Sequence, residues 1–128
     1  MTVILDSSAV LALLLNEPGA EIVADLFEDA VICSINLSEV AHGLVRNGNN
    51  EVQSRALIAK LDLDVIEADT EMALDAGFLR AKTDNFGLSI GDRFCFALGR
   101  RLGAEIITAD RMWQNAASVA NVSVKLIR

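Results

Sequence analysis

The sequence predicts an α/β fold, in which helices cover both faces of a parallel sheet. Short runs rich in Val, Ile and Leu alternate with helical runs along the whole chain, which is typical of such a sheet. Hydrophobic residues make up 52% of the 128 residues, enough to fill the core of one domain, and no repeat or linker interrupts them. We therefore expect a single domain over residues 1–128, built as a three-layer α/β/α sandwich around a parallel, roughly five-stranded sheet.

Five apolar runs have the length and composition of β-strands. Charged residues flank the run at 64–67, which favours a position at the edge of the sheet. In chain order, the expected strands are residues 2–5, 30–33, 64–67, 105–108 and 122–126.

Seven runs between these strands are expected to be helical, several with apolar residues at the three- and four-residue spacing of a helix face. Pro18 and Gly19 stop the first run, and Gly103 follows the sixth as a C-terminal cap. Asp69 or Thr70 opens the fifth run. In chain order, the expected helices are residues 9–15, 20–27, 34–45, 51–61, 70–82, 89–102 and 110–116, with a loop at 85–88.

The composition excludes several classes of protein. No apolar stretch reaches the roughly 18 residues that cross a bilayer, and no basic segment precedes the apolar run at 9–15. We therefore expect no membrane span, no signal peptide and a cytoplasmic location. Cys33 and Cys95 are not part of a CxxC motif and have no His cluster beside them, so we expect two buried, reduced thiols.

The formal net charge is -7. This argues against a protein that coats nucleic acid, because affinity for phosphate backbones comes largely from Lys and Arg. It does not exclude a nuclease, in which a metal-loaded acidic site attracts phosphate locally. The charge also suits a basic protein partner.

Four acidic residues, Asp6, Glu39, Asp92 and Asp110, lie where an apolar run gives way to the start of a helix. Functional groups in parallel α/β sheets collect at the carboxyl ends of strands, so these segments are expected to converge there. Asp6 follows the first strand and Asp110 the fourth, whereas no strand leads directly into Asp92. Helix capping is the alternative for each acid, as we expect for Asp69, and residues 36–39 and 89–92 resemble capping boxes.

The joint interpretation is a metal site. Hard oxygen ligands suit Mg²⁺ or Mn²⁺, and four acids can hold one or two such ions with water left for chemistry. Two ions roughly 4 Å apart clamp the attacking and leaving oxygens of a phosphoryl displacement, and no covalent nucleophile is needed.

Four neighbouring residues are candidate supporting residues of this site: Ser7, Asn36, Thr108 and Arg93. Asn36 is three residues before Glu39, so the two can share a helix face. Thr108 is two residues before Asp110 and alternates onto the same side of an extended segment. Local capping explains these polar residues equally well, and Arg93 is singled out because it directly follows Asp92.

Four segments resemble the acidic segments of the PIN-domain family, in order and at fitting intervals. They are VILDSSAVL at 3–11, SINLSEV at 34–40, LSIGDRFCFALG at 88–99 and ITADRMW at 107–113. The short single-domain form is similar to the VapC-type toxins of type II (VapBC) toxin–antitoxin pairs.

This resemblance implies a single PIN-like ribonuclease domain over residues 1–128. The implied activity is that of an Mg²⁺- or Mn²⁺-dependent endoribonuclease that hydrolyses RNA phosphodiester bonds. The implied partners are an RNA substrate, a cognate small antitoxin protein and a second copy of the chain in a homodimer. It further implies that the metal-binding and catalytic residues are Asp6, Glu39, Asp92 and Asp110, with Thr108 in support. Asn115 is a departure, because some members have a further acid near that position.

Two other classes of function stay open. A catalytically silent PIN-like binding module would use the acids only to dock a basic partner. A receiver or phosphatase-like Mg²⁺-dependent domain also carries Asp residues at strand ends. A receiver needs paired acids after the first strand and a late Lys, and a haloacid-dehalogenase-like phosphatase needs an Asp where Ser8 lies.

Overall fold

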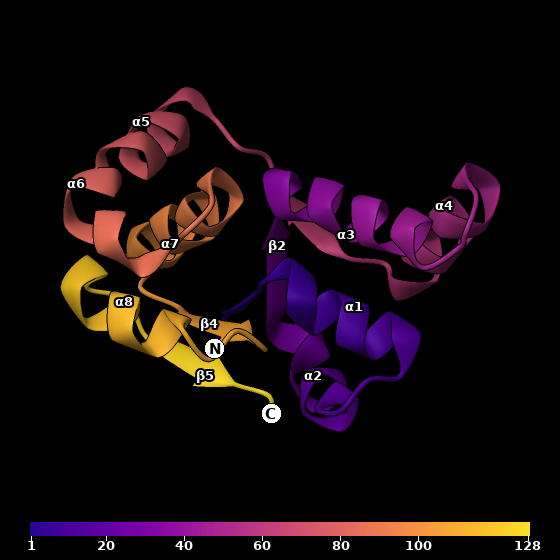
Figure 1. Ribbon diagram of the computed structural model, residues 1–128. Coiled ribbons are helices and arrows are strands. Elements are labelled where there is room, and N and C mark those ends of the chain that lie inside the picture. The colour runs from indigo at the N-terminus through magenta and orange to yellow at the C-terminus, as the bar shows by residue number, and fades with distance from the viewer.

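The computed structural model describes residues 1–128 and contains one five-stranded sheet in the order β3-β2-β1-β4-β5 (Figure 1). All neighbouring strands are parallel, and Val3 lies opposite Ala30 on one side and Glu105 on the other. The strands are β1 (Val3–Leu5), β2 (Ala30–Cys33), β3 (Asp64–Ile66), β4 (Glu105–Thr108) and β5 (Val124–Leu126). The expected fold class is confirmed, and β3 is an edge strand as its charged flanks predicted.

Eight helices and two short 3₁₀ helices surround this sheet. The helices are α1 (Ser7–Leu15), α2 (Ala20–Leu26), α3 (Ser34–Arg46), α4 (Glu51–Leu61), α5 (Thr70–Phe78), α6 (Arg80–Thr83), α7 (Ile90–Leu102) and α8 (Trp113–Ala120), and the 3₁₀ helices are η1 (Phe27–Asp29) and η2 (Asp84–Phe86). Helices α1 to α4 cover one face of the sheet and α5 to α8 the other, on the right and left of Figure 1.

The alternation of side chains along the strands separates two apolar cores. In β1, Ile4 belongs to the core beneath α5 to α8, whereas Val3 and Leu5 belong to the core beneath α1 to α4. In β4, Ile106 and Ile107 divide in the same way. Because both faces of the central strands are covered, these strands can be apolar throughout, which explains the uninterrupted apolar runs in the sequence.

The helix expected over residues 70–82 is interrupted at Leu79, so the chain forms two helices there, α5 and α6. At the break, the N–H group of Leu79 bonds to the carbonyl oxygens of Asp75 and Gly77. The buried hydroxyl of Thr83 donates to the carbonyl oxygen of Leu79 at 2.8 Å. Such a bond back to the preceding turn bends helices, and here it accompanies the change of direction.

The helix expected over residues 110–116 begins later, as α8 from Trp113 to Ala120. The side chain of Asp110 accepts a hydrogen bond from the N–H group of Met112 at 3.0 Å. This bond holds a turn ahead of the helix, so the helical bonds start only after it. The other predicted boundaries agree with the structure to within two residues, except that the expected loop at 85–88 begins inside η2.

Two further predictions concern membrane spans and the two cysteines. None of the helices is long and apolar enough to span a bilayer. Cys33 and Cys95 are free and buried, as expected, and burial raises the pKa of both thiols.

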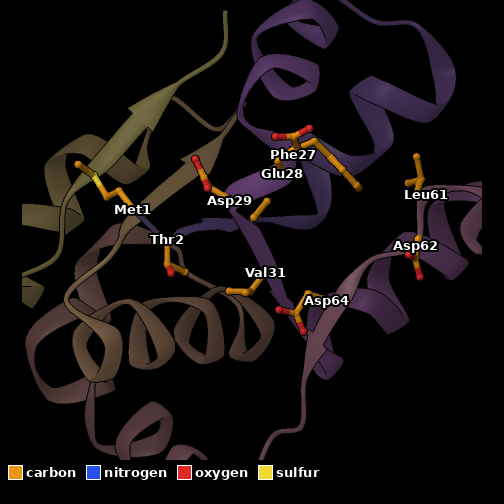
Figure 2. A pocket seen from close by; sticks show the side chains of 10 residues that line it. Met1, Thr2, Phe27, Glu28, Asp29, Val31, Leu61, Asp62 and Asp64 are labelled. Carbon is orange, nitrogen blue, oxygen red and sulfur yellow. The ribbon is translucent and has the colours of Figure 1, made fainter.

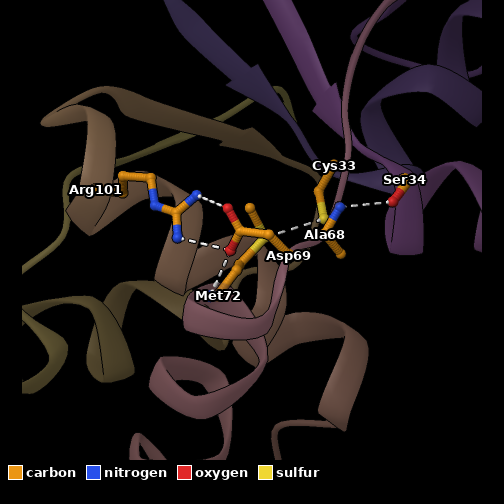
Figure 3. A network of polar contacts seen from close by, with 6 residues as sticks. All are labelled: Cys33, Ser34, Ala68, Asp69, Met72 and Arg101. Carbon is orange, nitrogen blue, oxygen red and sulfur yellow. Dashed lines mark hydrogen bonds and ion pairs between the residues drawn. The ribbon is translucent and has the colours of Figure 1, made fainter.

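Asp69 links the start of α5 to the end of α7 (Figure 3). Its carboxylate accepts the N–H group of Met72 at 2.8 Å, which confirms the expected helix cap. Both oxygens also face the guanidinium group of Arg101, at 2.8 and 2.9 Å. Beside this network, Cys33 Sγ lies 3.5 Å from Met72 Sδ, so the end of β2 and the first turn of α5 are in contact.

Replacing Asp69 with Asn is expected to lower the melting temperature at pH 7, since Asn keeps the helix cap but loses the charge facing Arg101. Replacing Asp69 with Ala should lower it further, because the cap is lost as well. The hydrogen bonds from Arg101 hold the pKa of Asp69 at about 2, below its usual 3.8. The advantage of the wild type is therefore present above pH 3.8 and disappears as the pH falls through about 2.

Thermal unfolding of wild type, Asp69→Asn and Asp69→Ala at pH 7 and pH 2 measures both effects. Identical melting temperatures for wild type and Asp69→Asn at pH 7 would contradict the stabilising role of the charge.

Candidate metal centre at the carboxyl edge of the sheet

The four predicted acids come from four separate elements. Asp6 directly follows β1, and Asp110 lies two residues after β4. Glu39 lies in the second turn of α3, which starts directly after β2. Asp92 is the third residue of α7, whose first turn meets α3: the Asn36 side chain donates to the carbonyl oxygen of Gly91 at 3.1 Å. This helix contact supplies the connection that the sequence lacked, since no strand leads into α7.

Asp6 is buried, with 3% of its surface exposed, and its carboxylate is held from two directions. The hydroxyl groups of Ser8 and Thr108 donate to Asp6 Oδ2 at 2.6 and 2.8 Å. The Ser8 hydroxyl also accepts the N–H group of Ala109 at 2.9 Å, which ties the start of α1 to the end of β4. Ser7 approaches Asp6 Oδ1 only at 3.4 Å, so Ser8 supports Asp6 more closely than the predicted Ser7 does.

Glu39 lies against the start of α7. Asn36 donates to Glu39 Oε1 at 2.8 Å, and the carboxyl group of Glu39 lies directly over Gly91. The capping-box interpretation of residues 36–39 is wrong, because α3 begins at Ser34 and its N-cap residue is Cys33. Glu39 is therefore free of the helix backbone and faces α7.

Asp92 and Asp110 each have a local backbone bond. Asp92 and Ser89 form the expected capping box, with Asp92 Oδ2 accepting the Ser89 N–H group at 2.9 Å. Asp110 is exposed and accepts the Met112 N–H group, while its own N–H group donates to Thr108 Oγ1 at 3.0 Å. The expected capping role is thus present for Asp92 only, since the bond to Asp110 forms a turn ahead of α8.

Three of the acids act on one another through their charges. Burial raises the pKa of Asp6, hydrogen bonds from Ser8 and Thr108 lower it, and the charge of Glu39 raises it further. Burial raises the pKa of Asp92 to about 6, and the charges of Asp6 and Glu39 add to that rise. Asp6, Glu39 and Asp92 therefore lie in one electrostatic field, whereas Asp110 is exposed.

The donor atoms suit a hard cation. Each of the four acids has one oxygen held by a hydrogen bond of 3.0 Å or less and a second oxygen without such a bond. As the side chains lie, no three His, Cys, Asp or Glu residues are close enough together to hold one ion directly. Mg²⁺ normally takes one or two carboxylates and keeps several waters, so the residues present fit such an ion with water completing its coordination.

None of the four surface cavities is lined by Asp6, Glu39, Asp92 or Asp110. A cavity of about 350 Å³ between α1 and α3 starts at Ser8 and reaches Arg46. A second acidic group lies at the opposite, amino edge of the sheet, where Asp29, Asp62 and Asp64 line a cavity of about 440 Å³ (Figure 2). Those side chains are exposed, and no buried polar group lies among them, in contrast to Asp6.

Arg93 is turned away from the acids by its own hydrogen bond. Its Nε donates to Thr83 Oγ1 at 3.2 Å, toward α6. Sequence reasoning did not single out Ser8 or Gly91. Ser8 carried a signal, because the second residue of a helix lies close to the side chain of the residue before it. The part played by Gly91 depends on a helix contact that the sequence does not encode locally.

Replacing Asp92 with Asn is expected to raise the melting temperature at pH 7 in the absence of metal. The pKa of Asp92 is about 6 in the folded protein and 3.8 in its usual environment, so the folded state binds the proton more readily. Wild-type stability should therefore rise as the pH falls from about 6 toward 3.8, and be lost again as the pH rises. The neutral amide avoids that loss and still accepts the Ser89 N–H group.

Thermal unfolding in the presence of a chelator, at pH 7 and pH 4, measures this difference. A gain for Asp92→Asn that is as large at pH 4 as at pH 7 would contradict the raised pKa.

Comparisons with known proteins place the chain in a family. A sequence profile described as the PIN domain matches residues 3–119. A search of curated proteins gives no significant match.

Solved structures are similar over nearly the full length. The crystal structure of VapBC2 from Rickettsia felis, bound to a DNA fragment from its promoter, has a TM-score of 0.78 at 16% identity, covering 98% of both chains. VapBC-1 from nontypeable Haemophilus influenzae has a TM-score of 0.73 at 21% identity, covering 99% of this chain and 98% of that chain. A toxin–antitoxin complex from Klebsiella pneumoniae has a TM-score of 0.68 at 18% identity, covering 85% and 87%.

At these identities the structural likeness is evidence for the fold alone. The sequence profile covers every strand except the last and all four acidic segments. This chain therefore belongs to the PIN domain family.

Proposed function

We propose that this protein is a metal-dependent endoribonuclease and the toxin of a type II toxin–antitoxin pair, similar to VapC. The observation that carries the proposal is the shared field of Asp6, Glu39 and Asp92, which come from three separate elements of a PIN fold. Mutual repulsion among one buried and two half-buried carboxylates is unfavourable without a cation, so this arrangement is the one expected of a cation site.

The proposed metal ligands are Asp6, Glu39, Asp92 and Asp110. Bound Mg²⁺ or Mn²⁺ would supply a more acidic water and offset negative charge on the phosphate. The chain itself orients the ligands: Ser8 and Thr108 hold one oxygen of Asp6 and leave the other free. No Ser–His or Cys–His pair accompanies the acids, which favours hydrolysis by water over a covalent intermediate.

An RNA substrate needs local positive charge on a chain with a net charge of -7. Arg46 is exposed and makes no ion pair, and it lines the same cavity as Ser8, whose hydroxyl bonds to Asp6. We place the path of the RNA backbone along this cavity, between α1 and α3.

A small antitoxin is the proposed partner. The similarity to a toxin–antitoxin complex and to VapBC proteins supports such a pairing, and the acidic surface suits a basic antitoxin segment. A homodimer and a cytoplasmic location complete the proposal.

One observation favours a second candidate, a PIN-like module that binds a basic partner without catalysis. No three acids are close enough to hold an ion directly as the side chains lie. Mn²⁺ binding without cleavage of any RNA would favour this candidate over the nuclease.

Replacing Asp6 with Asn is expected to lower the rate of RNA cleavage in Mg²⁺ or Mn²⁺ by on the order of 100-fold or more. The loss of a residue that only supports a metal ligand already lowers activity by up to that factor. The amide oxygen can still accept the Ser8 and Thr108 hydroxyl groups, so the fold should be retained. Inducible expression in a bacterium should stop growth with the wild type and not with Asp6→Asn. Asp69→Asn makes the same chemical change beside Arg101, at the opposite end of α7 from Asp92, and serves as the control.

Cleavage of several RNAs, followed by mapping of the cut ends, provides the measurement. Undiminished cleavage by Asp6→Asn would overturn the nuclease proposal.

Replacing Arg46 with Ala is expected to weaken RNA binding without changing Mn²⁺ binding, because Arg46 would contact phosphate and not the metal. The dependence of RNA affinity on salt should fall by about one unit of log–log slope. The control is Arg55→Ala, since Arg55 is exposed but is already paired with Glu51 at 2.9 Å. Equal losses for the two variants would contradict a specific RNA path past Arg46.

A further inference from the structure

Gly91 lies at the closest contact between α3 and α7. It is buried in the first turn of α7, and its backbone is helical, so no unusual conformation demands glycine there. A Cβ atom at this position would lie 2.8 Å from Glu39 Cδ and 3.1 Å from Glu39 Oε1, with Glu39 Oε2 closer still. Gly77, also helical, has nothing within 4 Å of such an atom. A side chain at position 91 would therefore push the Glu39 carboxylate away from its present place.

Asn36 holds the same carboxylate from the other side. Asn36 is fully buried, and its Nδ2 donates to Glu39 Oε1 at 2.8 Å and to the carbonyl oxygen of Gly91 at 3.1 Å. Both partners are acceptors only, so the NH₂ group of the amide must face them and its two hydrogens are both used. Asn36 Oδ1 is buried without a partner. The side chain is therefore placed for its two donated bonds, at the cost of an unsatisfied oxygen.

The two contacts together fix where Glu39 lies relative to Asp92. Asn36 bonds to the Glu39 carboxylate and to the residue preceding Asp92, so one side chain fixes the position of Glu39 relative to Asp92. Gly91 supplies the space that lets the carboxylate reach the first turn of α7.

We propose that Asn36 and Gly91 are positioning residues, which set the Glu39 carboxylate beside Asp92 and thereby set the affinity of the site for a divalent cation. This inference rests on the proposed function for its cation. The positioning of Glu39 by Asn36 and Gly91 rests on the contacts above and is tested separately.

A double-mutant cycle tests Gly91. Gly91→Ala is expected to weaken Mn²⁺ binding about 10- to 100-fold, the usual loss when a ligand's support is removed, and Gly77→Ala should leave it unchanged. In a Glu39→Ala background, Gly91→Ala should cause no further loss of Mn²⁺ affinity, because the carboxylate that the added methyl group would displace is absent. Free Mn²⁺ measured by electron paramagnetic resonance, and the rise in melting temperature with added Mn²⁺, give the affinities.

Unchanged Mn²⁺ affinity in Gly91→Ala, or an equal loss in both backgrounds, would overturn the positioning role. If the variant cleaves RNA, its activity should recover at saturating Mn²⁺ at a temperature at which it is already folded in a chelator, so that stabilisation by the ion does not explain the recovery.

Asn36→Leu tests the amide without adding a charge. It removes both donated bonds while keeping a buried side chain of similar size, so we expect weaker Mn²⁺ binding by a folded protein. Asn49→Leu is the control, because Asn49 lies just beyond the far end of α3 and donates only to the carbonyl oxygen of Leu44, at 3.1 Å. Equal Mn²⁺ affinities for Asn36→Leu and wild type would remove Asn36 from the proposal.

Melting temperatures in a chelator separate the two ideas. If Gly91 positions Glu39, Gly91→Ala should lower the melting temperature of the wild type. In the Glu39→Ala background the same change should not lower it, because Ala then only stabilises the helix, as we expect for Gly77→Ala. Failure of the wild type to bind Mn²⁺ would contradict the proposed function. The coupling between Gly91 and Glu39 in these melting temperatures would still test the positioning role.

Discussion

The burial of one carboxylate, Asp6, is the constraint on which the carboxyl edge of the sheet depends. Removing a charge from water is unfavourable unless hydrogen bonds replace the lost hydration. Here Ser8 and Thr108 supply them, and the same two hydroxyl groups accept the backbone N–H groups of Ala109 and Asp110. The groups that make the buried charge tolerable therefore also join β1 to β4 and set the path of the chain as it leaves the sheet.

The opposite side of the candidate site depends on a contact between the two helix layers. Helix α3 belongs to one layer and α7 to the other, and they meet beyond the end of the strands through Asn36, Glu39 and Gly91. A parallel sheet ends in helices on both faces, so its carboxyl edge is where side chains from the two layers can face each other. The acids gather there because of this architecture, although they are far apart in sequence.

Much of the fold could be predicted because the strands obey simple rules. Their apolar runs are short, they alternate with helical runs, and the charged flanks of β3 marked an edge. The predictions failed at the break at Leu79 and at the late start of α8, where a hydroxyl group and a carboxylate bond to the backbone. Such local bonds compete with helical ones, and periodicity in apolar residues does not report them.

The sequence by itself determined the strands, most of the helices and which residue types can bind a cation, because composition and spacing act through local chemistry. It also determined that Asp69 and Asp92 cap helices, since a cap needs only residues three positions apart. Only the tertiary structure decided that Asp6, Glu39 and Asp92 share one field and that the Glu39 carboxylate occupies the space over Gly91. Those facts depend on distances between segments of chain that are remote in sequence, and such distances are fixed by packing.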